Sequence, residues 1–134
     1  MNDFKYNDGG KAKTGRKGVS GDCGVRAMAI ALGIDYDSCY KELAQANKDF
    51  GYAKSARNGL HKNVYEYVLQ KHGYVWKKAP KFEGRKAYYD DISLIANGNV
   101  ILRMARHYSA LVGFQINDIW DCRYKMVYGY WEKG

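Results

Sequence analysis

The chain has 134 residues, a net charge of +8 and a mean hydropathy of −0.58. This length fits a single domain, and a hydrophobic content of 46% is enough to build a core. No apolar run is long enough to cross a membrane and the first residues form no hydrophobic signal, so we expect a soluble, cytoplasmic protein without a membrane partner. Three cysteines cannot all pair within one chain, which favours free thiols in a reducing compartment.

The positive charge is concentrated in two stretches of the chain. Residues 54–86 hold nine Lys or Arg against two Glu, and residues 1–21 hold five against two Asp. Such a surplus is either a solvated basic face or a surface that attracts an acidic protein, an acidic peptide or a nucleic acid. The candidate binding residues are Lys77, Lys78, Lys81, Arg85 and Lys86.

Helices are predicted in the first half of the chain. Residues 1–20 carry several glycines among lysines and predict a flexible basic arm, so the domain proper is assigned to residues 21–134. Apolar residues three and four apart predict helices over 22–32, 38–47 and 60–72.

The second half is predicted to consist mainly of strands. A short strand at 74–76, a basic loop at 77–86 and a short helix at 90–96 precede strands at 99–105, 108–112, 116–120 and 126–131. Helices first and strands afterwards predict an α+β domain, in which N-terminal helices pack on a C-terminal antiparallel sheet.

Cys23 and His107 are the residues with the clearest chemical potential. Cys23 begins an alanine-rich apolar helix, where the helix dipole and free backbone N–H groups favour a thiolate. His107 begins a strand-like run much later in the chain, and an imidazole next to a thiol can act as its base. Either residue alone is more often structural than catalytic, but the two segments together favour a nucleophile–base pair.

A thiol site also needs a group that orients the imidazole and donors for the oxyanion. Asp121 is the first candidate for orienting His107, and Asp118 is its rival because alternation along a strand lets only one of them face the histidine. The backbone N–H of Cys23 can donate to an oxyanion, and Ser20 and Asp22 are the polar side chains just upstream.

Two other kinds of site have weaker support. A zinc site made of Cys23, His107 and Cys122 is conceivable, but no closely spaced pair of Cys or His supports it. The glycines near the start of the chain lack the strand–loop–helix context of a phosphate loop. We therefore expect neither a metal nor a cofactor.

These motifs resemble a known superfamily. Asp22-Cys23-Gly24 before an apolar helix, and His107-Tyr108 before an apolar strand with an aspartate on the next one, resemble the bacteriocin-processing (double-glycine) peptidase domains, which are papain-like cysteine peptidases. Over about residues 20–131 the chain also resembles small phage and bacterial cysteine-peptidase-like proteins, with matches at Cys23–Ala27, Arg106-His107, Trp120–Cys122 and Val127–Trp131.

The resemblance implies a papain-like fold and a thiol hydrolase that cleaves a peptide, isopeptide or amide bond of a protein or peptide substrate. It implies Cys23 as nucleophile, His107 as base and Asp121 as third member. Such peptidases carry a glutamine about six residues before the cysteine, and Lys17 stands at that position here. This departure keeps an alternative open, a non-catalytic protein-binding module on the same fold that modulates a host or defence factor. Nucleic-acid binding is a third, weaker possibility.

Overall fold

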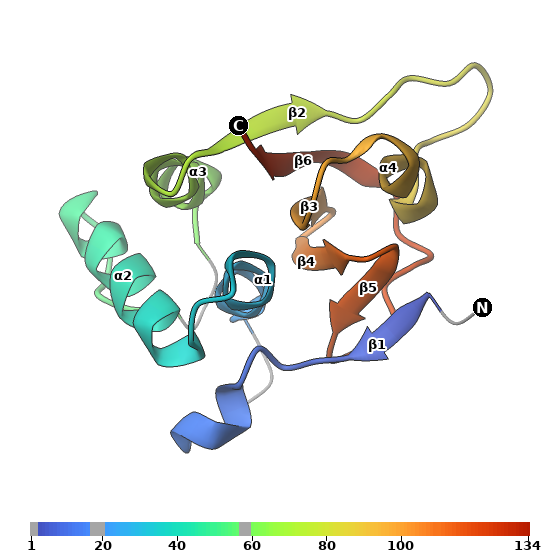
Figure 1. The fold of residues 1–134 in the computed structure, drawn as a ribbon. Coiled ribbons are helices and arrows are strands. Elements are labelled where there is room, and N and C mark those ends of the chain that lie inside the picture. Colours follow the sequence, from blue (N-terminus) through green and yellow to red (C-terminus); the bar gives the residue numbers. More distant parts are fainter. Residues whose placement is uncertain (1–2, 17–20, 57–59) are drawn as a thin grey trace.

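The computed structural model describes residues 3–16, 21–56 and 60–134 of the chain. Its helices are η1 (Lys11–Thr14, a 3-10 helix), α1 (Cys23–Leu32), α2 (Tyr36–Asp49), α3 (Lys62–Lys71) and α4 (Tyr89–Ile95). Its strands are β1 (Phe4–Tyr6), β2 (Tyr74–Lys78), β3 (Val100–Met104), β4 (His107–Val112), β5 (Gln115–Asp118) and β6 (Val127–Lys133). The predicted α+β class is confirmed (Figure 1).

The strands form one mixed sheet in the order β1-β5-β4-β3-β6-β2. Consecutive strands β3, β4 and β5 form the expected antiparallel meander, whereas β6 pairs with β3 and β2 rather than continuing from β5. The β3–β4 turn consists of Ala105 and Arg106 only, because Met104 pairs with His107. This tight turn fixes where His107 enters the sheet.

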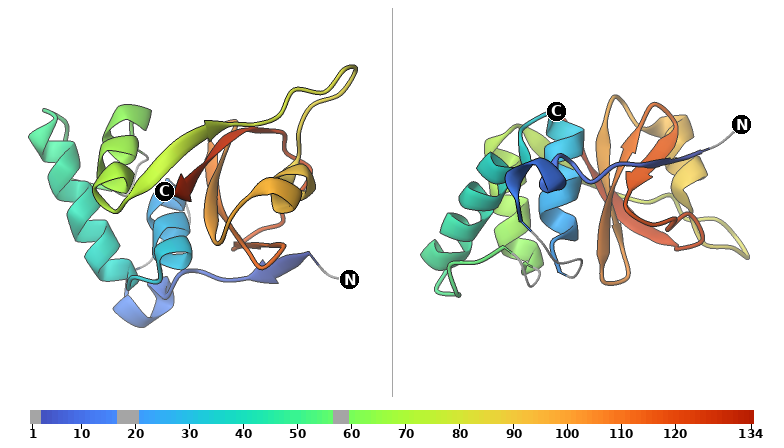
Figure 2. Two further views of the ribbon diagram at one scale, coloured as in Figure 1. Left: turned by 45° about the horizontal axis from the view of Figure 1, so that its top comes forward. Right: turned by 90° about the horizontal axis from the view of Figure 1, so that it is seen from below.

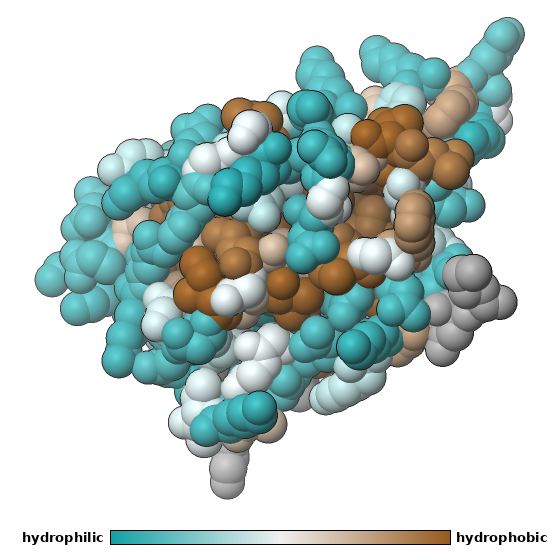
Figure 3. Space-filling model, viewed as in Figure 1, coloured by the Kyte–Doolittle hydropathy of each residue, from teal (hydrophilic) through white to brown (hydrophobic). Residues whose placement is uncertain are grey.

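Helices cover both faces of the sheet. Helices α1, α2 and α3 lie on one side and α4 lies on the other (Figure 2). Alternation along β3 divides the core accordingly, because Ile101 packs with the three helices whereas Val100 and Leu102 pack with Ile92 of α4. The space-filling view, from the same side as Figure 1, shows apolar side chains across the middle of the molecule and over α4 (Figure 3).

Helix α1 is buried on almost all sides, because the sheet and α2 both pack against it. Its small residues allow this close approach. A Cβ atom on Gly24 would lie 3.1 Å from Cε1 of Tyr65, and the Tyr65 hydroxyl donates to the Gly24 carbonyl at 2.7 Å. The helix that begins with Cys23 is therefore fixed in position by α3.

Part of the segment predicted as a flexible basic arm forms a strand of the sheet. Strand β1 pairs in parallel with β5, and the N–H of Ile116 donates to the Asp3 carbonyl at 2.7 Å. Phe4 packs against the core on the α4 side of the sheet, which explains why this short strand is held in place. The composition does not predict this strand, because a three-residue strand in a basic, glycine-rich segment carries little signal. Residues 17–20 of the predicted arm lie outside the described ranges.

Candidate functional site

Cys23 and His107 line the same pocket, as predicted from the sequence. The pocket has a volume of about 300 Å³, and Leu60, Arg103 and Arg106 are among its other lining residues. Cys23 is the first residue of α1 and is half-buried, so its sulfur is accessible from the pocket. The first backbone N–H groups of a helix have no partner within the helix, and they can stabilise negative charge on a substrate or on the thiolate.

His107 lies between Cys23 and a carboxylate. Its Nε2 atom is 2.7 Å from Oδ2 of Asp118, and His107 lines the same pocket as Cys23, whose thiol helps to raise the pKa of the imidazole. Because Asp118 occupies Nε2, Nδ1 is the ring atom left for the thiol. Arg106, the residue before His107, has a positive φ of 54°, which is uncommon for a residue with a side chain. The tight turn therefore holds a strained conformation next to the site.

The third member of the site is Asp118, and the preference for Asp121 is wrong. Strand β5 ends at Asp118, so Asp121 lies beyond the sheet in an exposed segment. There the Asp121 carboxylate accepts two hydrogen bonds from the Arg123 guanidinium, at 2.9 and 2.7 Å. Asp118 is only 3% exposed and His107 only 7%, so their hydrogen bond is shielded from water.

Several groups hold the Asp118 carboxylate in place. The Ser109 hydroxyl donates to Oδ2 at 2.7 Å, and the backbone N–H of Ile119 donates to Oδ1 at 2.7 Å. Ser109 was missed in the sequence, although it lies two residues after His107 on the same strand and so faces the same way. A carboxylate with several donors is held both in its charged form and in one orientation.

Asp22 is part of a buried ionic network and is not an oxyanion donor. Its carboxylate accepts from the Tyr36 hydroxyl at 2.7 Å, lies 2.7 Å from Nζ of Lys11, and pairs with Arg26. Arg26 in turn places Nη2 3.6 Å from Oδ1 of Asp118. A carboxylate so occupied is an acceptor only. Ser20, the other upstream candidate, lies outside the described residues, as does Lys17 at the position of the expected glutamine.

The pKa values of Cys23, His107 and Asp118 are all shifted toward the charged form of each group. Burial raises the pKa of the Cys23 thiol, but hydrogen bonds from His107 and from the Tyr108 backbone outweigh it, and the pKa lies below its usual value. Burial lowers the pKa of His107, but hydrogen bonds with Asp118, Cys122 and Cys23 outweigh it and raise the pKa. The pKa of Asp118 is lowered despite burial, chiefly by its bond with His107. All three shifts therefore favour the charged forms, thiolate, imidazolium and carboxylate, relative to the same groups in water.

An aromatic side chain covers the histidine. The rings of Trp120 and His107 lie 4.8 Å apart between centroids, at an angle of 50°. The indole thus shields an edge of the site from solvent, which strengthens the electrostatic interactions inside it. In the sequence Trp120 stands out only as part of the Trp120–Cys122 match, and its place two residues after Asp118 carries no signal for this contact.

One group of possible metal ligands lies in the site. The metal-ligand candidates that come together among the described residues are His107, Asp118 and Cys122, whose donor atoms all lie within 4.8 Å of one another. This set differs from the zinc set considered from the sequence, because Asp118 takes the place of Cys23. His107 and Asp118 are already joined by a direct hydrogen bond, and the Cys122 thiol donates to Oδ2 of Asp118 at 3.6 Å. The three groups thus satisfy one another without an ion.

The candidate binding residues divide into two groups. Lys78, Lys81, Arg85 and Lys86 line a second pocket, of about 530 Å³. Lys77 does not, because alternation along β2 turns it to the other face, where its Nζ lies 2.9 Å from Oε2 of Glu132. Lys77 is therefore excluded from the group that faces this pocket.

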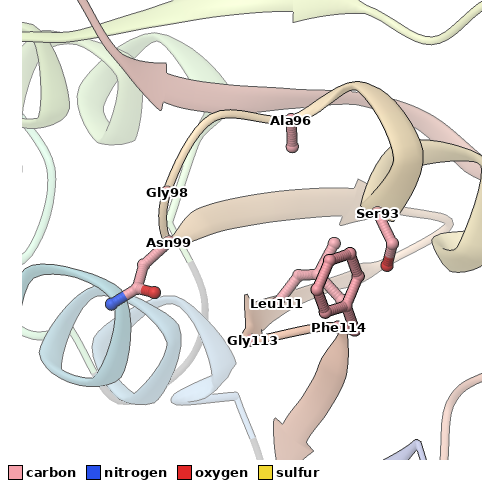
Figure 4. Close-up of a pocket in the computed structure, with 7 residues that line it drawn as sticks. All are labelled: Ser93, Ala96, Gly98, Asn99, Leu111, Gly113 and Phe114. Atoms are coloured by element: carbon pink, nitrogen blue, oxygen red, sulfur yellow. The ribbon is translucent and has the colours of Figure 1, made fainter.

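A third pocket offers little chemistry. It has a volume of about 280 Å³ and lies between the end of α4 and the β4–β5 turn (Figure 4). Its lining includes Ser93, Asn99 and Phe114 but no titratable side chain. It can hold a small group but cannot move a proton at neutral pH.

Comparison with protein-family models, with curated proteins and with solved structures finds no match for this chain. Among the described residues, no helix has the length and apolar character needed to cross a membrane.

Proposed function

We propose that this protein is a cysteine hydrolase of papain-like type, with Cys23 as nucleophile, His107 as general acid and base, and Asp118 as the group that orients the imidazole. The observation that carries the proposal is the arrangement around His107. Its ring is hydrogen-bonded to Asp118, and it lines one pocket together with Cys23, whose pKa it lowers and whose thiol raises its own. This is the nucleophile–base–orienter pattern of covalent catalysis.

Acylation begins with the Cys23 thiolate, which attacks the carbonyl carbon of a peptide, isopeptide or other amide. A carbon–sulfur bond forms, and the oxyanion that results is stabilised by the backbone N–H of Cys23. The carbon–nitrogen bond then breaks, and the imidazolium of His107 gives its proton to the leaving amine. The product is a thioester on Cys23 and a neutral imidazole.

Deacylation uses the same groups in reverse roles. Neutral His107 takes a proton from water, and the hydroxide attacks the thioester carbon. The carbon–sulfur bond breaks, a carboxylic acid leaves, and thiolate and imidazolium are restored. Throughout, Asp118 keeps the Nε2 proton of His107 hydrogen-bonded, which leaves Nδ1 as the ring nitrogen that takes up and gives back the proton. A papain-like assignment is supported by the order of the elements: nucleophile on an early helix, base and carboxylate on later strands.

Thiol reactivity tests this proposal directly. Iodoacetamide should alkylate Cys23 at pH 6–7 much faster than Cys39, because burial raises the pKa of Cys39 to about 12. Peptide mass spectrometry follows each cysteine, and His107→Ala should remove most of the advantage. If native Cys23 reacts no faster than a model thiol, the site is not an activated nucleophile and the fold serves for binding instead.

A further inference from the structure

We infer that the second pocket is a substrate subsite for an acidic peptide segment, so that the hydrolase acts on chains with Asp or Glu residues on one side of the bond it cleaves. The inference rests on the proposed function, because it assigns the substrate class of the same site. The pocket is called the basic subsite below. Its cations are Lys62, Lys78, Lys81, Arg85 and Lys86.

The basic subsite is cationic without compensation from its own lining. No Asp or Glu lines it among the described residues. Lys78, Lys81 and Lys86 take part in none of the ion pairs of the described residues, and all three are exposed. An anionic ligand would therefore meet three available ammonium groups and need not break an existing pair.

The loop that carries these lysines has a fixed shape. It leaves β2 and projects beyond the sheet before returning to α4 (Figure 1). Phe82 and Arg85 pair across the turn at its tip, and Arg85 makes two hydrogen bonds of 2.8 Å with Asp91 of α4. A site held open in this way loses less conformational entropy when a ligand binds.

The basic subsite adjoins the catalytic pocket. Arg103 lines the catalytic pocket, and its guanidinium lies 5.4 Å from the ring centre of Tyr128, which lines the basic subsite. Leu60 and Lys62, two residues apart, also line one pocket each. An extended peptide advances about 3.3 Å per residue, so one strand of substrate can pass from the sulfur over Arg103 and Tyr128 into the basic subsite.

The aromatic rings of the subsite favour carboxylates over nucleotide bases. Lys62 lies over the Trp76 ring at 4.7 Å, and Arg85 lies over the Phe82 ring at 3.8 Å. Single-stranded nucleic acids bind through bases that stack on free aromatic faces. Here each of these rings already has a cation on one face, and the cations are what the surface presents to a ligand.

Peptide binding to the full-length Cys23→Ala protein tests the inference without turnover. The probes are fluorescein-labelled peptides of equal length, one with a run of glutamates and one with lysines in their place, and a labelled oligothymidylate. We expect the glutamate peptide to bind. The triple variant Lys78→Glu, Lys81→Glu, Lys86→Glu should lower the affinity for this peptide by about tenfold or more. The matched control replaces three exposed lysines outside both pockets, Lys13, Lys48 and Lys54, by glutamate. It should change the affinity for the glutamate peptide by less than about twofold.

Three outcomes would overturn the inference. The glutamate peptide could fail to bind, the control triple could weaken it as much as the subsite triple, or the oligothymidylate could bind more tightly than the peptide. The circular dichroism of each variant shows whether it is folded. Because binding is measured without the thiol, the proposed function fails separately, through an unreactive Cys23 in the alkylation experiment.

Discussion

At the scale of single residues, we expect the reactivity of Cys23 to depend on the carboxylate of Asp118, which acts through His107. Asp118 stabilises the imidazolium of His107, and the imidazolium in turn stabilises the thiolate. Asp121, only three residues further on, has no part in this chain of contacts because it is exposed and bonded to Arg123. Two chemically identical residues thus differ in function through position alone.

Asp118→Asn and Asp121→Asn form a matched pair that tests this difference. An amide at position 118 cannot balance the imidazolium charge, so we expect alkylation of Cys23 at pH 6 to slow by about tenfold or more. Asp121→Asn should change the rate by less than about twofold. Equal slowing in both variants would mean that the carboxylate acts through the general charge of the protein rather than through His107.

At the scale of elements, α3 is bound to α1, the helix that begins with Cys23, through one buried hydroxyl group. Tyr65→Phe removes the 2.7 Å hydrogen bond to the Gly24 carbonyl and leaves the ring stacked on Tyr108. We expect the free energy of unfolding to fall by about 1 kcal/mol, as is usual for a hydrogen bond in a protein. Urea denaturation measures this value. The control is Tyr67→Phe on the same helix, where the side chain is 46% exposed and the change should be under about 0.5 kcal/mol.

Strand β1 provides a second test at this scale. Phe4 packs against the core, whereas Tyr6 is 67% exposed. Phe4→Ala should lower the free energy of unfolding by about 1–2 kcal/mol, less than for a fully buried ring, because Phe4 is only half-buried. Tyr6→Ala should cost little. Equal and small effects in urea denaturation would mean that the N-terminal segment is loosely attached in solution.

The sequence predicted most elements because their signals are local. The apolar run from Ala27 to Leu32, followed by Gly33, is sufficient to place α1, and alternation is sufficient to place β3 and β4. The end of β5 was predicted two residues too late because a side-chain contact, rather than a local pattern, ends the strand. Asp118 accepts a hydrogen bond from the next backbone N–H, that of Ile119, and the chain leaves the sheet there.

The site was predictable only in part for a similar reason. Cys23 and His107 each stand at the start of an element, and such positions can be recognised in a sequence. The choice between Asp118 and Asp121 depends on where a strand ends, and the contact between Arg26 and Asp118 depends on how α1 crosses the sheet. Neither has a local signal, because each is a property of packing between elements distant in the chain.

At the scale of the whole molecule, the Cys23–His107 pair links stability to pH. In the unfolded chain a histidine has a pKa of 6.5 and a cysteine one of 9.0. Folding raises the first, so the stability from His107 is complete below pH 6.5 and is lost as pH rises toward its folded pKa. Folding lowers the second, so the stability from Cys23 is complete above pH 9 and is lost as pH falls toward its folded pKa.

Between the folded pKa of Cys23 and pH 9 these two trends oppose each other. The folded pair holds one proton on the imidazole, and the unfolded pair holds one proton on the thiol, so unfolding neither binds nor releases protons. The pair should therefore contribute a constant stability in this range.

Cys23→Ala removes only the cysteine, so that unfolding of this variant releases the His107 proton. The free energy of unfolding of the variant should therefore fall between pH 8 and 9 by up to about 1.4 kcal/mol relative to that of the wild type. Urea denaturation at both pH values measures the difference, and His107→Gln combined with Cys23→Ala is the control that should abolish it. If wild type and Cys23→Ala follow parallel curves over this range, the thiol and the imidazole are not an ion pair in the folded protein.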